Sequence, residues 1–126
     1  MSKFESIIKS NPFLFSEIEK EEGSRQIYII NNHKRVYFQS CKISEANTMW
    51  NAIPWEVFNS IDYYCLKIED RGFMFMPVSI LRYFATLFPL NNARFDLHFI
   101  IGDGKIEFVT PRGHANIDIR EYYHSL

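Results

Sequence analysis

The clearest structural signal in the chain is the stretch RFDLHFIIGDGKIEFVT, residues 94–110. Two runs of alternating apolar residues flank Gly102-Asp103-Gly104, and glycine supplies the positive φ that a tight hairpin turn needs. Because successive side chains of a strand point to opposite faces, every second residue from Phe95 to Ile101 belongs to one inward set. The stretch therefore predicts a β-hairpin that buries one of its faces.

Two earlier parts of the chain carry the same kind of signal. Apolar runs at 27–30 and 36–41 enclose an Asn-rich connection, and asparagine tolerates the positive φ of a tight turn. Runs at 61–68 and 73–76 enclose Glu69–Gly72, so they predict another antiparallel pair.

Helix signals precede and separate these hairpins. Ser2 and Glu5 have the spacing of a capping box at the start of a first helix, and residues 13–22 predict a second helix. Pro54 predicts a single helical turn, and Pro77 begins a longer helix with one apolar face.

The remaining segments complete the expected element order. Residues 44–51 are predicted to form a loop, and residues 118–125 fit a short helix, with a strand around Ile117 and Ile119 as the alternative. The order ααββ(α)ββαββα predicts a single α+β domain over residues 1–126. We expect a mostly antiparallel sheet built from hairpins, with helices packed on one face.

The composition is that of a globular protein with an unusually aromatic interior. Apolar residues make up 47% of the 126 residues and charged residues 23%, which excludes a disordered chain. Twelve Phe, seven Tyr and two Trp supply more large apolar surface than a minimal core needs, so we expect part of it to contact a partner. The formal net charge of −1 means that a nucleic-acid role would need a local basic face.

The chain carries no sign of secretion or membrane insertion. Cys41 and Cys65 are its only cysteines, and Met1 to Lys9 lacks the long apolar region of a secretory signal, so we expect reduced thiols and a cytoplasmic protein. The longest apolar run is far shorter than a membrane span of about 18 to 20 residues. We predict no cofactor, because a chain of this length can bury a sufficient core without one.

The first candidate site is one face of the strand at 36–41, where side chains alternate between two faces. Basic groups on that face could meet phosphates while Tyr and Gln contact bases. The alternative is a solvated sheet face, because outer strands often carry Lys and Arg for solubility. The residues expected to contact nucleic acid or a partner are Lys34, Arg35, Tyr37, Gln39, Lys42 and Arg112.

A second candidate site is a metal centre on the hairpin at 94–110. Asp96 and His98 share one strand face and Glu107 lies on the opposite strand, so these three could ligate a divalent ion. The alternative is cross-strand ion pairing. No catalytic residue is predicted, since the chain has no Gly-x-Ser-x-Gly elbow and no glycine-rich phosphate loop.

Aromatic side chains form the third candidate, a protein interface. Trp, Tyr and Phe dominate the cores of protein interfaces. We expect the anchors of such a surface to be Trp50, Trp55, Tyr63 and Tyr64.

The region from Val36 to Tyr83 resembles domains of restriction and defence proteins that are related to the PD-(D/E)XK nuclease superfamily. The pattern is VYFQSCK at 36–42, a Trp-containing segment, IDYYCLKI at 61–68 and FMFMPVSIL at 73–81. In that superfamily an Asp precedes a Glu-x-Lys or Gln-x-Lys, because two acidic oxygens hold Mg²⁺ while Lys assists the attacking water. Here Gln39 and Lys42 are separated by two residues and Asp62 follows them, so the resemblance implies a related, non-catalytic module with these three as site candidates.

Three functions follow from these observations. The leading hypothesis is a non-catalytic module associated with DNA restriction or phage defence that contacts nucleic acid or a nuclease partner. The first alternative is a protein-interaction domain, either a small inhibitor or immunity-type protein or a homodimer. The second alternative is a metal-dependent nuclease that uses Asp96, His98 and Glu107.

Overall fold

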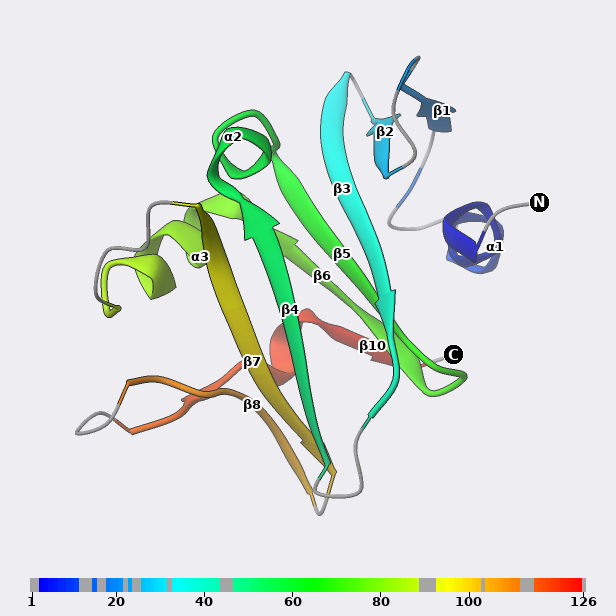
Figure 1. Cartoon of the computed structure of the whole chain (residues 1–126). Coiled ribbons are helices and arrows are strands. Elements are labelled where there is room, and N and C mark those ends of the chain that lie inside the picture. Colours follow the sequence, from blue (N-terminus) through cyan, green and yellow to red (C-terminus); the bar gives the residue numbers. More distant parts are fainter. Residues whose placement is uncertain are drawn as a thin grey trace.

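Ten strands, three α-helices and one 3-10 turn make up the described part of this computed structural model (Figure 1). The structure describes residues 3–11, 15, 18–21, 23, 26–31, 33–43, 47–88, 93–102, 104–111 and 115–125. The helices and the turn are α1 (Lys3–Ser10), α2 (Trp55–Phe58), α3 (Val78–Ala85) and η1 (Arg120–Tyr122). The strands are β1 (Ile18–Lys20), β2 (Ile27–Ile30), β3 (Lys34–Cys41), β4 (Thr48–Pro54), β5 (Tyr63–Ile68), β6 (Gly72–Pro77), β7 (Arg94–Gly102), β8 (Lys105–Phe108), β9 (Ile117–Asp118) and β10 (Tyr123–Ser125).

The strands divide between two sheets. One has six strands in the order β1-β2-β3-β5-β6-β10, and the other has four in the order β4-β7-β8-β9. Neighbouring strands pair antiparallel except β3 and β5, which run parallel with Val36 opposite Tyr63. The predicted α+β class and the mostly antiparallel pairing are confirmed.

Turn and cap residues act at the local positions that the sequence indicates. Gly102 and Gly104 have φ values of 147° and 77°, and they close the predicted β7–β8 hairpin with Ile101 opposite Ile106. Pro54 and Pro77 have extended backbone and stand directly before α2 and α3. The predicted helical turn after Pro54 and the helix after Pro77 are therefore confirmed.

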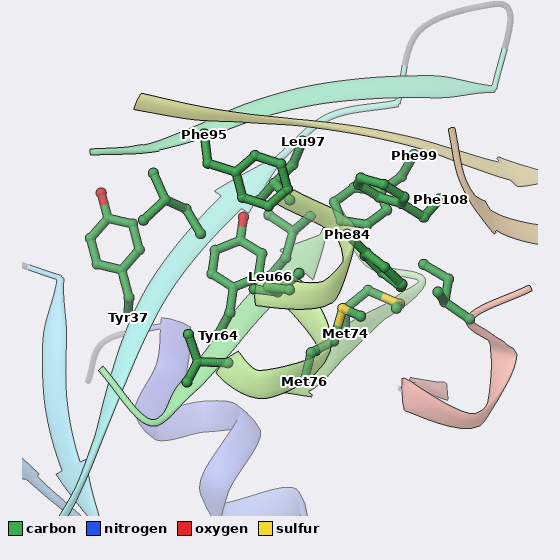
Figure 2. Packing of buried hydrophobic residues seen from close by; sticks show 14 of the residues in the cluster. Tyr37, Tyr64, Leu66, Met74, Met76, Phe84, Phe95, Leu97, Phe99 and Phe108 are labelled. Carbon is green, nitrogen blue, oxygen red and sulfur yellow. The ribbon is translucent and has the colours of Figure 1, made fainter. Parts of the chain in front are cut away.

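The main core lies between the two sheets (Figure 2). Tyr64 and Met74 project into it from the six-stranded sheet, and Leu97 and Phe99 project from the four-stranded sheet. Helix α3 contributes Phe84, whose ring stacks on Phe108 with the centroids 4.4 Å apart. Both sheets thus bury their apolar faces against each other and against α3.

A second core lies on the other face of the six-stranded sheet, beneath α1. Phe4, Ile7 and Ile8 form the apolar stripe of this helix and are buried. The Phe4 ring lies 4.7 Å from that of Tyr28 and 5.0 Å from that of Phe38, centroid to centroid. Burial of each of these three helix side chains stabilises the fold by about 1.5–3 kcal/mol, which holds a helix of only two turns on the sheet.

The arrangement of layers differs from the predicted single sheet with helices on one face. Helix α1 covers one face of the six-stranded sheet, whereas α3 packs on the opposite side, between the sheets (Figure 1). The helices therefore lie on both sides of that sheet. Apolar residues on both faces of β3, β5 and β6 cause this, because each face needs its own cover.

Two predicted elements have the wrong type. Part of the predicted helix at 13–22 is strand β1, in which Ile18 pairs with Ile30, and part of the predicted loop at 44–51 is strand β4. Backbone pairing with a neighbouring strand outweighs local propensity in both places. The tail forms β9, η1 and β10, so the strand alternative near Ile117 and Ile119 holds in part. Within the described residues, no helix has the length and apolar character needed to cross a bilayer.

Candidate contact surfaces

The predicted basic and aromatic face of β3 lies inside the molecule. Tyr37 is only 6% exposed and belongs to the core between the sheets. The Gln39 side chain donates from Nε2 to the carbonyl oxygen of Ala52 in β4 at 3.0 Å and accepts at Oε1 from the Tyr64 hydroxyl at 2.6 Å. The prediction that Tyr37 and Gln39 form an exposed contact surface is wrong, because the four-stranded sheet covers this face of β3.

Burial of these polar groups changes their protonation chemistry. Desolvation raises the pKa of Tyr37 and raises that of Tyr64 well above its ordinary value. Tyr37 also hydrogen-bonds from its hydroxyl to Gln26 Oε1 at 3.2 Å. The side chains of Tyr37, Gln39 and Tyr64 thus form a neutral hydrogen-bonded group that joins the two sheets.

Arg35 is committed to contacts within the chain. Its Nε and Nη2 donate to the two carboxylate oxygens of Glu21, both at 2.9 Å, and its Nη1 donates to the Ser60 carbonyl at 2.6 Å. The Arg35 backbone N–H donates to Asp62 Oδ2 at 2.9 Å. The paired guanidinium is a poor phosphate ligand, and one carboxylate oxygen of Asp62 is engaged by the backbone of β3.

Lys34 and Lys42 do not share a surface. Lys34 begins β3 and Lys42 follows its end, so they lie at opposite ends of a strand about 26 Å long. Lys42 lines a hollow with Lys67 and with the acidic Glu69 and Asp70. Arg112 lies outside the described residues.

Three of the four predicted interface aromatics are core residues. Tyr64 is 0% exposed. Tyr63 stacks on Phe75 with the centroids 4.8 Å apart, in the core beneath α1. Trp55 is half-buried and stacks on Phe95 at 5.8 Å. The two internal cores use much of the aromatic surface. The prediction of an interface is wrong for Tyr64, and for the partly exposed Tyr63 and Trp55 it stays a prediction.

Trp50 is different, because 65% of its surface is exposed. It stands on β4 directly opposite His98 on β7, and the two rings stack with centroids 3.8 Å apart and an interplanar angle of 20°. Burial lowers the pKa of His98, so the ring beneath the indole is neutral at physiological pH. The stack holds a large apolar side chain in a fixed position at the surface.

We call the outward side of the four-stranded sheet the open sheet face. Trp50, His98 and their neighbours alternate with the buried residues of β4, β7 and β8 and so point away from the core. In the described part of the chain, no helix packs over this side (Figure 1). The open sheet face consists of Thr48, Trp50, Ala52, Pro54, Arg94, Asp96, His98, Ile100, Lys105, Glu107 and Asp118.

The predicted metal ligands lie on this face without forming a metal site. Asp96 Oδ1 accepts a charged hydrogen bond from Arg94 Nε at 3.0 Å. Glu107 pairs with Ile100 rather than with Asp96 or His98. Across the residues that the structure describes, no cluster of three His, Cys, Asp or Glu side chains could hold a metal ion. The predicted ligand set Asp96, His98 and Glu107 is therefore wrong.

Sequence reasoning missed several residues of the candidate surfaces. Ile100 and Asp118 enter the open sheet face through the strand register, and Arg71 and Arg120 line a separate pocket described below. The alternation of Met49, Asn51 and Ile53 is the signal that could have identified β4 and the outward position of Trp50.

Comparison with protein-family models, with curated proteins and with solved structures finds no match. The resemblance to nuclease-related domains of restriction and defence proteins stays a hypothesis.

Proposed function

We propose that the chain is a non-catalytic recognition module that binds a protein partner through the open sheet face. The partner is a protein that offers an apolar pocket for the Trp50 indole and a cationic group beside it. The resemblance of residues 36–83 to restriction and defence domains makes a nuclease subunit the partner that we favour.

The exposed Trp50 stack is the observation that carries this proposal. Truncation of Trp at an interface commonly costs more binding energy than truncation of other residues, and such residues act best when they are already held in place. Trp50 loses little conformational freedom on binding because it already stacks on His98. Ile100 adds apolar surface on the same side of β7.

The charges on the open sheet face favour a protein over a nucleic acid. Arg94 and Asp96 neutralise each other. Glu107 and Asp118 are directly opposite on β8 and β9, and within the described residues neither carboxylate has an ion-pair partner. Two adjacent carboxylates repel phosphates, whereas an Arg or Lys of a partner protein would relieve their mutual repulsion.

A site-specific photocrosslinking experiment tests the proposal. A photoreactive phenylalanine analogue replaces Trp50 in one variant and Tyr83 in another, because Tyr83 is 59% exposed on α3 and lies off the open sheet face. We expect one defined protein adduct from position 50 in the producing cell and none of that protein from position 83.

The purified partner then provides the decisive measurement. We expect Trp50→Ala to weaken its binding by at least about thirty-fold, which corresponds to the roughly 2 kcal/mol of an interface hot spot. Tyr83→Ala should leave binding unchanged. Equal adducts from both positions, or equal affinity of Trp50→Ala and the wild type, would overturn the proposal.

Nucleic acid is tested separately with the wild-type chain and duplex DNA at two salt concentrations. Saturable, salt-sensitive DNA binding that Trp50→Ala abolishes would replace the protein partner with a nucleic acid. The absence of binding at the lower salt concentration supports the protein assignment.

A further inference from the structure

A pocket opens between the edge of the six-stranded sheet and the turn end of the β7–β8 hairpin. Its volume is about 350 Å³, which lies at the lower end of the range for small-molecule sites. Strands from both sheets and the turn η1 contribute to its walls. The lining residues are Arg71, Ile101, Gly102, Gly104, Lys105, Ile106, Arg120 and Tyr123.

The charge of this pocket has one sign. Arg71, Lys105 and Arg120 are cationic, and none of the described lining residues is acidic. Neither Arg71 nor Lys105 has an ion-pair partner among the residues that the structure describes, while Arg120 donates from Nη2 to the Gly104 carbonyl. Three cationic residues around one small pocket create a positive potential that favours an anion.

Backbone packing fixes the position of Tyr123 beside Arg71. Strand β10 pairs with β6, and a side chain at Gly72 would approach the Tyr123 hydroxyl to 2.6 Å. Glycine at position 72 therefore allows the phenol ring to lie close against the sheet edge. Burial raises the pKa of Tyr123, and the positive charge of Arg71 opposes that rise, so the guanidinium lies within electrostatic reach of the phenol.

The pocket combines cationic and apolar lining residues. Ile101 and Ile106 face the inner side of the hairpin, and with the Tyr123 ring they give the pocket an apolar lining. A bare inorganic anion would use the cations and leave this lining unfilled. A ligand with an anionic end and a flat or apolar body would use both.

We propose that this pocket binds a small organic phosphate, with its phosphate group at Arg71, Lys105 and Arg120 and its body against Tyr123 and the two isoleucines. Guanidinium groups bind phosphate through paired, charge-assisted hydrogen bonds, which a carboxylate-free mouth leaves available. The formal net charge of −1 gives the protein no general attraction for polyanions, so the local pocket rather than the whole surface provides the recognition.

Titration of the full chain with inorganic phosphate and with adenosine monophosphate tests this assignment. Amide and side-chain chemical shifts report where each compound binds. We expect saturable shifts at Gly104, Lys105 and Tyr123 with both compounds. Adenosine monophosphate should bind at least about ten-fold more tightly than phosphate, because its body covers apolar wall that phosphate leaves exposed.

Substitutions on exposed side chains separate binding from folding. Arg71→Gln should weaken adenosine monophosphate binding by roughly ten-fold or more, as expected for loss of a hydrogen bond to a charged group. Arg71→Lys should restore part of the loss because it keeps the charge. Arg82→Gln, on the exposed side of α3, is the matched control and should bind like the wild type.

Four outcomes would overturn the proposal. The first is the absence of saturable shifts with either compound, and the second is unchanged affinity in a folded Arg71→Gln variant. The third is binding of a single-stranded oligonucleotide at this pocket that adenosine monophosphate does not displace, which would assign the site to a nucleic acid. Equal affinity for phosphate and for adenosine monophosphate would reduce the assignment to an inorganic-anion site and so contradict the organic ligand.

Discussion

Removal of a single oxygen atom from Tyr64 should destabilise the whole fold measurably. The Tyr64 side chain is completely buried, and its hydroxyl donates to Gln39 Oε1 at 2.6 Å. Tyr64→Phe keeps the ring and its packing but leaves the half-buried amide oxygen of Gln39 without this donor. The cost of a buried polar group that loses its partner is about 1–3 kcal/mol.

The expected loss is therefore about 2 kcal/mol in the free energy of unfolding. For a domain of this size that loss corresponds to a decrease in Tm of roughly 6–10 °C. Urea denaturation followed by circular dichroism measures it, and the slope m should stay constant because the variant exposes the same surface on unfolding.

Tyr63→Phe is the matched control. Tyr63 is the neighbouring residue on β5, its ring stacks on Phe75, and its hydroxyl has no hydrogen-bond partner within the described residues. We expect a change of less than about 0.5 kcal/mol.

A double-mutant cycle with Gln39→Leu isolates the bond itself. Gln39→Leu should cost less in the Tyr64→Phe background than in the wild type, because the second substitution removes an oxygen that already lacks its donor. Equal stability of Tyr64→Phe and Tyr63→Phe, or strictly additive costs in the cycle, would refute the reasoning that the bond between the Tyr64 hydroxyl and Gln39 stabilises the fold.

Two further predictions concern protonation. Trp50→Ala should raise the pKa of His98 toward its ordinary value, because this variant lacks the indole that excludes water from the imidazole. Chemical shifts of the imidazole as a function of pH measure this pKa. An unchanged pKa would mean that Trp50 does not desolvate the ring. Stability should fall as the pH rises above the ordinary cysteine and tyrosine pKa values of about 8.5 and 10, because burial raises the pKa values of Cys65 and Tyr64 and only the unfolded chain can release these protons. Urea denaturation midpoints measured across alkaline pH test the second prediction. Cys65→Ala should make the fall of stability with pH less steep. Stability that does not change over this pH range would contradict the prediction.

The lowered pKa of His98 also predicts how the stability of the fold changes at acidic pH. Neutral His98 contributes stability that is fully present above the ordinary histidine pKa of about 6.5 and is lost as the pH falls toward the lower folded value. The Trp50→Ala variant should lose less of this stability in that window.

Local signals predicted most elements of the fold. These signals involve residues that are close together in the chain, so a single sequence is enough to recognise them. They are the glycine residues of the β7–β8 turn, the proline residues before α2 and α3, and the alternation in β7. The missed strands are β1, β4 and β10. Strands β4 and β10 pair with partners that are distant in sequence, β7 and β6, and Trp50 carries no local sign of that partner. Strand β1 pairs with the next strand, β2, but it has only three residues, too few for a clear alternation.

The candidate site was harder to predict than the fold, for a physical reason. The two-residue period correctly separates Val36 and Phe38 from Tyr37 and Cys41, since the first pair packs beneath α1 and the second pair packs between the sheets. The two-residue period does not indicate which face of a strand a second sheet covers. Polar side chains such as Gln39 appear suited to water, yet they can be buried when internal partners satisfy them.

The path of the chain between the sheets has a consequence for how the protein can be divided. The chain leaves the six-stranded sheet after β3, returns at β5, leaves again after β6 and returns at β10. A single cut between β3 and β4 leaves the four-stranded sheet whole, but any single cut between strands divides the six-stranded sheet. We therefore expect the molecule to fold in one cooperative step with many distant contacts, and to tolerate poorly any attempt to express its halves separately.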